Sequence, residues 1–152
     1  MPASPQDQAI LLELQRDSRQ SNADLAARLG LSASALWRRI RALEDAGVIS
    51  GYGAKVDPAR MGLGFRAIVH VHLTRHDRDQ LAAFLRVIAH CPQVQDCYAT
   101  TGQADYHLHV LCADLDAYNH FLEEVLFASP AVASAQTNVV LRAIKTGAPI
   151  GG

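Results

Sequence analysis

The segment Ser32-Ala-Ser-Ala-Leu-Trp-Arg-Arg-Ile-Arg-Ala-Leu-Glu44 decides the fold of the first half of the chain. Ser32 is a favourable N-cap residue, and Gly47 is a favourable place for a helix to stop, so a helix is expected between them. Its apolar residues recur at helical spacing and predict one buried stripe, formed by Leu36, Ile40 and Leu43. This stripe leaves the basic side chains on or beside the outer face.

Two further helices are expected before this one. Ser21 is followed three residues later by Asp24, which resembles a capping box, and Gly30 ends the short apolar stripe that follows. An earlier helix is predicted with Asp7 as its cap, from the apolar residues Ile10, Leu11 and Leu14. Because only Gly30-Leu31-Ser32 separates the second and third helices, the sequence predicts a helix-turn-helix.

The outer face of the third helix carries side chains of the types that contact DNA in other proteins. Serines near a helix N-terminus approach phosphates together with the backbone N–H groups, and arginine bonds either phosphate oxygens or guanine edges. Two other interpretations remain open: Trp37 as a partly buried packing residue, and Arg41 as the partner of Asp45 on a solvated face. The candidate DNA-binding residues are Ser32, Ser34, Trp37, Arg38, Arg39 and Arg41.

The segment after Gly47 changes character. Its short glycine-containing stretches predict a small β wing followed by a linker. Pro58, Gly62 and Gly64 then interrupt any regular element, so we place the domain boundary nearby. The predicted domains are residues 1–57, with the helix-turn-helix and the hinge, and residues 58–152.

The second half alternates strands and helices. Strands are predicted at Phe65–Leu73, Val94–Thr101, Tyr106–Cys112 and Gln136–Ile144. Helices are predicted at Asp77–Ala89 and after Asp114. The resulting order β-α-β-β-α-β is that of a ferredoxin-like sandwich with both helices on one face of the sheet. The fold class is therefore α+β.

In such a sandwich the second face of the sheet stays open. That face is expected to carry Ile68, His70, His72, His107, His109 and Leu111. A mixed apolar and imidazole surface predicts a homodimer through this sheet. The histidine cluster His70, His72, His107 and His109 has the ligand type that zinc and nickel accept. We favour a metal-free interface, because neither strand supplies a carboxylate or thiolate beside these histidines.

The composition is that of a globular protein, with 49% hydrophobic and 19% charged residues and a net charge of −1. No apolar run approaches the roughly 20 residues that span a bilayer, so no membrane partner is expected. The three cysteines form no CxxC pair, which favours a reducing cytoplasm, and Cys112 is expected in the core.

The chain resembles the Lrp/AsnC (feast/famine) family of transcription regulators. The residues that carry the resemblance are Asp7-x-x-Ile10-Leu-x-Glu-Leu-Gln-x-Asp17, Asn22-x-x-Leu25-Ala-x-x-Leu-Gly-Leu-Ser32, Arg39-Ile-x-x-Leu-Glu-x-x-Gly-Val-Ile49, Gly51-Tyr52, Gly102-Gln-Ala-Asp105-Tyr106 and Ile144-Lys145. The resemblance implies a winged helix-turn-helix, a hinge and a ferredoxin-like (RAM-type) sensing domain. It also implies binding to double-stranded operator DNA, homodimers that assemble further into octamers, control of amino-acid-related metabolism, and a small amino acid as effector without any other cofactor.

The family's effector loop commonly reads Gly-Asp-x-Asp-Tyr, and here Gln103 replaces the first acid. A neutral amide offers hydrogen bonds but no charge for an amino group, which puts the usual mode of amino-acid binding in doubt. The alternative is that Gly102–Asp105 is a hairpin turn that binds no ligand. The effector-binding residues that the resemblance implies are Thr101, Gly102, Gln103, Ala104, Asp105, Tyr106 and Thr137.

Two other functions deserve a test. Siroheme decarboxylases are similar in both domains, but where they carry His-Asn-Tyr and Tyr-Asn-Leu-Trp-Phe motifs this chain has Asp96-Cys-Tyr98 and Asp105-Tyr-His-Leu-His109. We therefore expect no enzymatic activity. An architectural protein that wraps DNA with little sequence preference is the second alternative, and competition against random DNA distinguishes it from a regulator.

Overall fold

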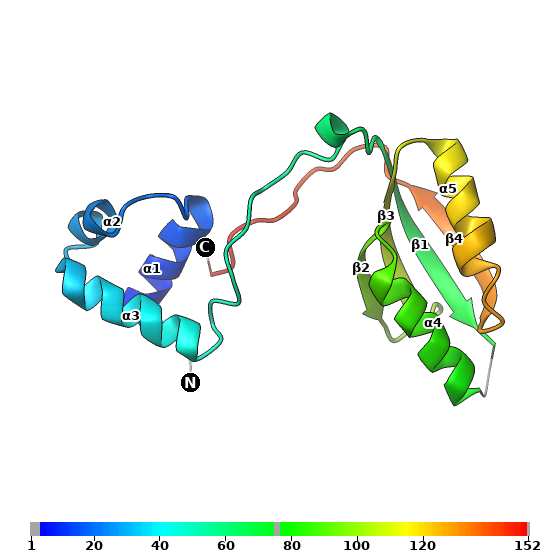
Figure 1. Cartoon of the computed structure of the whole chain (residues 1–152), viewed down its shortest axis with the longest axis horizontal. Helices are drawn as coiled ribbons and strands as arrows, with labels where there is room; N and C mark the ends of the chain where they lie inside the picture. The colour runs from blue at the N-terminus through cyan, green and yellow to red at the C-terminus, as the bar shows by residue number, and fades with distance from the viewer. Residues whose placement is uncertain (1–3, 75–76, 152) are drawn as a thin grey trace. The chain divides into compact units, whose positions relative to one another are not determined.

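The computed structural model describes residues 4–74 and 77–151, which fall into two compact units (Figure 1). The first unit comprises Met1–Lys55 together with Ile144–Gly152, and the second comprises Val56–Ala143. The predicted division after residue 57 lies close to the observed one. The last residues differ from the prediction, because they pack with the first unit instead of the second.

Gln15 attaches the C-terminal residues to the first unit. Its side-chain oxygen accepts a hydrogen bond from the backbone N–H of Ile150 (2.8 Å), and its amide nitrogen donates one to the carbonyl of the same residue (3.1 Å). The side-chain amide thus pairs with a backbone unit as a neighbouring strand would. In the described parts of the chain, no helix is long and apolar enough to cross a membrane.

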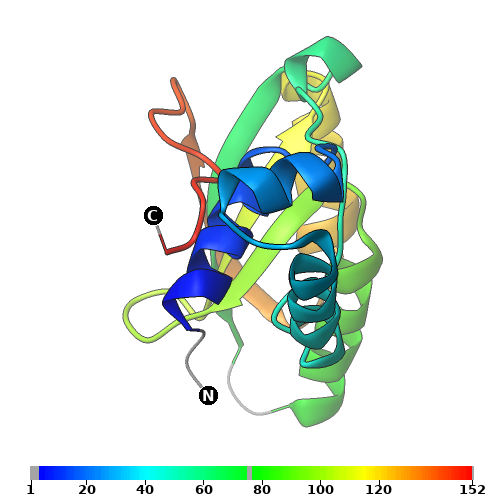
Figure 2. The ribbon, with the colours of Figure 1, turned by 90° about the vertical axis from the view of Figure 1, so that its left-hand side faces the viewer.

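Three helices build the first unit: α1 (Pro5–Arg16), α2 (Asn22–Arg28) and α3 (Ala33–Asp45), seen in Figure 2. Each begins with a serine N-cap, at Ser4, Ser21 and Ser32, whose side chain accepts a backbone N–H bond. The predicted cap at Asp7 is wrong by three residues. Ser4 is the cap, and Asp7 completes a capping box by accepting from the Ser4 backbone N–H (3.3 Å).

The core of this unit confirms the predicted apolar stripe on α3. Leu36 and Leu43 are buried, and Ile40 packs against them from a partly buried position. The buried residues of the unit are Ile10, Leu25, Ala26, Leu36 and Leu43. Gly30 and Gly47 both adopt positive φ, 65° and 69°, where a side chain would be strained. They end α2 and α3 as predicted.

The wing region differs in detail from the prediction. Residues 48–57 contain no strand, although short β segments were expected there. Gly51 (φ 158°) and the extended residues after it find no ladder partner within the described chain, and an isolated extended segment has no backbone bonds to stabilise it as a strand. The segment leads to a single 3₁₀ turn, η1 (Ala59–Met61).

The second unit is a four-stranded antiparallel sheet covered by helices. Its elements are β1 (Phe65–Leu73), α4 (Arg78–His90), β2 (Val94–Ala99), β3 (Tyr106–Cys112), α5 (Leu115–Phe121), the π-helical turn η2 (Leu122–Leu126) and β4 (Val132–Val139). The strand order is β2-β3-β1-β4, as a split β-α-β sandwich requires.

The last strand begins and ends earlier than predicted. It spans Val132–Val139, whereas the sequence suggested Gln136–Ile144. Val139 pairs with Ala67 near the start of β1, and the final rung runs from the Val140 N–H to the Arg66 carbonyl (2.9 Å). Beyond this point β1 offers no further partner, so the apolar Leu141 stays 96% exposed although its sequence environment resembles a strand.

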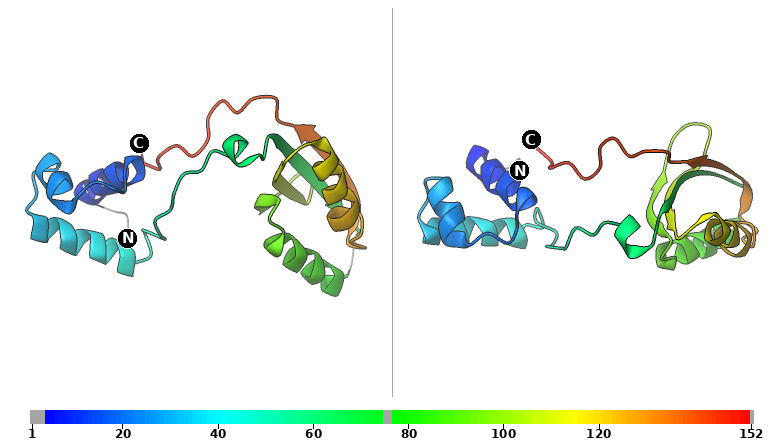
Figure 3. Two further views of the ribbon diagram at one scale, coloured as in Figure 1. Left: turned by 45° about the horizontal axis from the view of Figure 1, so that its top comes forward. Right: turned by 90° about the horizontal axis from the view of Figure 1, so that it is seen from above.

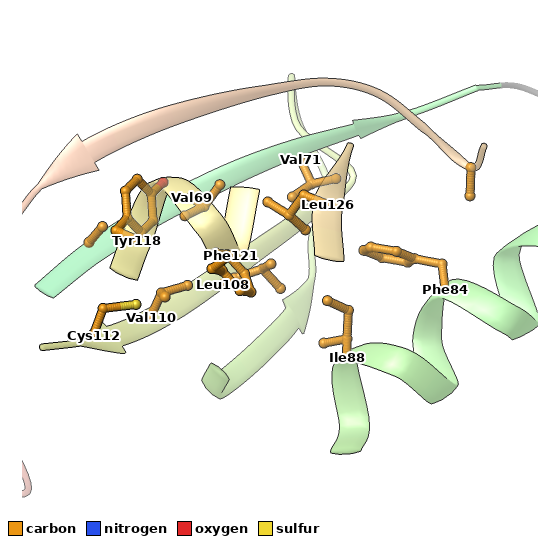
Figure 4. Packing of buried hydrophobic residues seen from close by; sticks show 12 residues of the cluster. Val69, Val71, Phe84, Ile88, Leu108, Val110, Cys112, Tyr118, Phe121 and Leu126 are labelled. Atoms are coloured by element: carbon orange, nitrogen blue, oxygen red, sulfur yellow. The ribbon is translucent and has the colours of Figure 1, made fainter. Parts of the chain in front are cut away.

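Helices α4 and α5 lie on the same face of the sheet (Figures 1 and 3). Alternate residues of β1 and β3 point into the layer between helices and sheet, where they meet Phe84 and Ile88 of α4 (Figure 4). The labelled core residues are Val69, Val71, Phe84, Ile88, Leu108, Val110, Cys112, Tyr118, Phe121 and Leu126. The predicted α+β architecture is therefore confirmed, with Cys112 in the core.

Candidate DNA-binding face and effector loop

The outer face of α3 presents three of the predicted DNA-binding residues. With 3.6 residues per turn and Leu36 directed inward, Ser34, Arg38 and Arg41 fall on the opposite side of the helix, and all three are exposed. Ser32 caps the helix with its hydroxyl on the Ala35 N–H (3.2 Å) and lies 3.3 Å from the Ser34 hydroxyl. The N-terminal turn and the two arginines together form a polar, positively charged face.

Arg39 has a different place from its neighbours. Its guanidinium Nη1 lies 2.8 Å from Oδ1 of Asp7, which ties α3 to the start of α1. The Ser4 hydrogen bond and then Arg39 hold the pKa of the Asp7 carboxyl below its ordinary value, although partial burial opposes them. Arg39, predicted as a DNA-binding residue, therefore braces the domain.

Arg41 is paired, but not with the predicted residue. Its Nη1 lies 3.2 Å from Oε2 of Glu44, one helical turn on, rather than beside Asp45. The other oxygen of Glu44 accepts a hydrogen bond from the Tyr52 hydroxyl (2.9 Å). Burial and then this carboxylate raise the pKa of the Tyr52 phenol, so the hydroxyl remains a donor at neutral pH.

The sequence interpretation missed this role of Tyr52 and Glu44. Both residues belong to the motif that carries the family resemblance, but nothing in their spacing indicates that they meet. They meet because the chain turns at Gly47, which brings the segment after α3 back beside that helix. Trp37 is 58% exposed at the edge of the same region and helps to line a hollow of about 390 Å³ with Tyr52 and Glu44.

The predicted effector loop is the hairpin between β2 and β3. Gly102 has φ 127°, and Thr101 and Gln103 are exposed, while Ala104 is buried beneath the loop. Asp105 is exposed but bonded to the backbone of β1: its Oδ2 accepts from the Leu73 N–H (2.8 Å) and its backbone N–H donates to the Val71 carbonyl (3.0 Å). The Asp105 carboxylate thus satisfies a backbone group beside the irregular end of β1.

The two remaining members of the predicted effector set face the helices. Tyr106 stacks edge-on against Phe84 with ring centroids 6.0 Å apart. Thr137 lies on β4, and its hydroxyl is 2.5 Å from that of the buried Tyr118. Because β1 separates β4 from the hairpin strands, one chain does not bring Thr137 to the loop. Within one chain, the exposed hairpin loop and the partly buried Thr137 therefore belong to two separate regions.

The open face of the sheet carries the histidines as predicted. His70 and His107 are direct register partners with their rings edge to face, 4.6 Å between centroids. His109 Nδ1 lies 3.0 Å from Oδ2 of Asp96 on β2, and Asn138 Nδ2 lies 3.1 Å from His70 Nε2. Neither β1 nor β3 places a carboxylate beside these histidines, in agreement with the prediction, but the neighbouring strand β2 supplies Asp96.

Within residues 4–74 and 77–151, no three histidine, cysteine or acidic side chains converge to form a metal site. His72 lies two residues after His70 on β1, where it pairs in register with Ser134 of β4 and, among the described residues, has no register partner on β3. Leu111, expected on the open face, is buried.

Both halves of the chain match known domain families. Residues 4–50 match a winged helix-turn-helix DNA-binding domain, and residues 66–150 match the Lrp/AsnC ligand-binding domain. These matches together cover the greater part of the chain and follow the observed division into two units, apart from residues 144–150, which belong to the first unit.

Named relatives and solved structures agree with these matches. The Bkd operon transcriptional regulator of Pseudomonas aeruginosa is 39% identical over 138 residues, which cover 91% of this chain and 90% of that protein. The leucine-responsive regulatory protein of Escherichia coli is 34% identical, covering 91% and 85%. The crystal structure of a Neisseria meningitidis transcriptional regulator in complex with L-methionine superposes with a TM-score of 0.93, at 33% identity and coverage of 98% and 96%.

Proposed function

Because the chain belongs to the Lrp/AsnC family of transcription regulators, with a DNA-binding unit and a ligand-binding unit, we propose that it binds operator DNA through the outer face of α3. The observation that carries this proposal is that the guanidinium of Arg38 is free to contact DNA. This side chain is exposed, and it makes no hydrogen bond or ion pair with any described residue. An uncommitted guanidinium beside a serine-rich helix start favours contact with the phosphate backbone.

The variant Arg38→Ala tests the proposal, with Arg86→Ala as its matched control. Arg86 is exposed on α4 of the other unit, so its loss changes the net charge equally without touching α3. We expect Arg38→Ala to weaken binding to every duplex by a similar factor, on the order of tenfold, and to lower the salt slope by about 0.9 for each lost contact. Equal binding by the two variants would remove α3 from the interface.

The second unit is proposed to bind a small amino acid at the hairpin loop. Support comes from the match to the ligand-binding domain and from the Neisseria regulator, which was crystallised with L-methionine. Gln103 is exposed and has no bonded partner among the described residues, so it is available to a ligand. Since its amide is neutral, backbone groups of the loop have to supply much of the recognition of a zwitterion.

Thermal unfolding against a panel of amino acids tests this proposal. A ligand at a hundredfold excess over its dissociation constant stabilises the native state by about 2.7 kcal/mol, which raises the unfolding temperature by several degrees. Gln103→Ala is expected to change which amino acid gives the shift, while Gln95→Ala on β2 serves as the control. No shift with any member of the panel would contradict an amino-acid effector.

We further propose a homodimer through the open face of the sheet, and further assembly up to an octamer. Ile68 and His70 lie on this face only partly covered within one chain. Sedimentation of Ile68→Glu tests the interface, with Val87→Glu on the exposed side of α4 as control. The first variant is expected to sediment as a monomer at micromolar concentration and the second as the wild-type assembly. A monomeric wild-type chain would contradict the proposal.

The alternative functions are not favoured, because the relatives are named transcriptional regulators. We therefore propose that the chain has no enzymatic activity. A haem or sirohaem absorption band in the purified protein would count against this view.

A further inference from the structure

The two exposed arginines of α3, Arg38 and Arg41, differ in their bonding partners. Arg38 extends from the helix without a bonded partner among the described residues. Arg41 instead has its guanidinium held by Glu44 (3.2 Å), whose second oxygen is occupied by the Tyr52 hydroxyl (2.9 Å). The side chain of Glu44 is only 28% exposed, while that of Arg41 is 61% exposed, so the carboxylate forms the base of the pair and the guanidinium its outer end.

The pairing of Arg41 with Glu44 suits a contact to a base edge better than a contact to a phosphate. Guanidinium has five N–H donors, and Glu44 engages one nitrogen, so donors remain for a bidentate contact. Holding the planar group in place reduces the conformational entropy that is lost when it binds a fixed pattern of acceptors. A phosphate contact gains less, because the carboxylate of Glu44 lies close by and repels a second anion.

We propose that Arg41, held by Glu44 and Tyr52, is the residue of α3 that reads a guanine in the major groove, whereas Arg38 binds the backbone. Guanine presents its O6 and N7 acceptors side by side there, which matches the guanidinium fork. Glu44 and Tyr52 act on DNA only through Arg41 and are positioning residues. The inference rests on the proposed DNA-binding function and assigns sequence reading and affinity to different side chains.

The experiment uses the full chain and two DNA probes. One is a short duplex enriched by the wild-type chain from a random-sequence pool, and the other is the unselected pool. Each G·C pair of the enriched duplex is then replaced in turn by A·T, and binding of all these duplexes is measured for the wild type and for single variants. The single variants are Arg38→Ala, Arg41→Ala, Glu44→Gln, Tyr52→Phe and the control Glu124→Gln, an exposed acid on η2 of the other unit; the double variant Arg41→Ala/Glu44→Gln is measured beside them.

The expected result is a loss of discrimination at one G·C pair of each half-site in Arg41→Ala, by at least about fivefold. Glu44→Gln and Tyr52→Phe should lower discrimination at the same pair by about two- to fivefold, the size of an exposed ion-pair effect. Arg38→Ala should weaken binding to all duplexes alike, and Glu124→Gln should match the wild type. In an Arg41→Ala background, Glu44→Gln should have no further effect on discrimination.

Two outcomes overturn the inference. One is unchanged discrimination in Arg41→Ala, and the other is an equal effect of Glu44→Gln with and without Arg41. Tyr52→Phe keeps the test valid even where Glu44→Gln lowers the unfolding temperature, because it removes only one exposed hydroxyl. If the pool yields no enriched duplex at all, the proposed function fails, and that result is distinct from failure of the inference.

Discussion

The two units place their chemically important side chains by different means. In the first, the groups proposed to meet DNA come from one helix, and their direction follows from the spacing of Leu36 and Leu43 on its buried side. In the second, the polar side chains of the candidate sites bond to residues from another strand or helix, as His109 of β3 bonds to Asp96 of β2. Local periodicity therefore predicts the first arrangement well, whereas the second depends on strand pairing.

The largest expected effects come from the two cores and test whether the units are independent. Leu36 and Leu108 are both fully buried, one in each unit, and either Leu→Ala change is expected to cost about 3 kcal/mol. Hydrogen exchange should then increase only across α1–α3 for Leu36→Ala and only across the sheet for Leu108→Ala. Faster exchange in both units of either variant would show that they unfold together.

A smaller effect is expected at the brace between α1 and α3. Asp7→Ala removes both the capping-box partner of Ser4 and the ion pair with Arg39, and should destabilise the first unit by about 1 kcal/mol. Because the folded pKa of Asp7 lies below its ordinary value of 3.8, the stabilisation is present above that value and is lost as pH falls through the folded pKa.

The measurement is chemical denaturation of wild type and Asp7→Ala from neutral pH down to pH ~3. The difference in unfolding free energy between wild type and Asp7→Ala should stay constant near neutral pH. It should shrink as the pH falls below the ordinary pKa of an aspartate. A difference that grows on acidification would contradict the assigned role of Asp7.

The smallest effect is expected on the open face of the sheet. Asp96 is 45% exposed and His109 25% exposed, so Asp96→Asn should change the unfolding free energy by less than about 1 kcal/mol. Asp79→Asn, on the first turn of α4, is a control of equal charge change. Both variants are compared in the Ile68→Glu background, in which the proposed partner subunit does not cover the pair, and a loss of several kcal/mol in Asp96→Asn there would contradict a weak, exposed ion pair.

Much of the fold follows from the sequence for identifiable reasons. Serine caps and glycines with positive φ set the limits of α2 and α3, and alternation of apolar residues gives β1 and β3 with correct bounds. The limits of β4 could not be predicted, because they depend on where β1 begins rather than on the apolar residues that follow Val139. The attachment of Ile150 to Gln15 had no local signal either.

The candidate sites were predictable to different degrees. Ser34, Arg38 and Arg41 were assigned to an outer face from helical spacing alone, and they lie on it. The partners of Arg41 and His109, and the backbone role of the Asp105 carboxylate, required the three-dimensional structure. Each of these contacts joins residues whose relation is set by a turn or by strand register.

The most direct test of the central claim is a comparison of two dissociation constants for the unmodified chain at physiological salt. One is for a duplex that the chain has enriched from a random pool, and the other is for the pool itself. A regulator that reads its operator through α3 should prefer the enriched duplex by roughly a thousandfold or more. Equal affinity for the two DNAs would contradict the claim and would favour a protein that wraps DNA without regard to sequence.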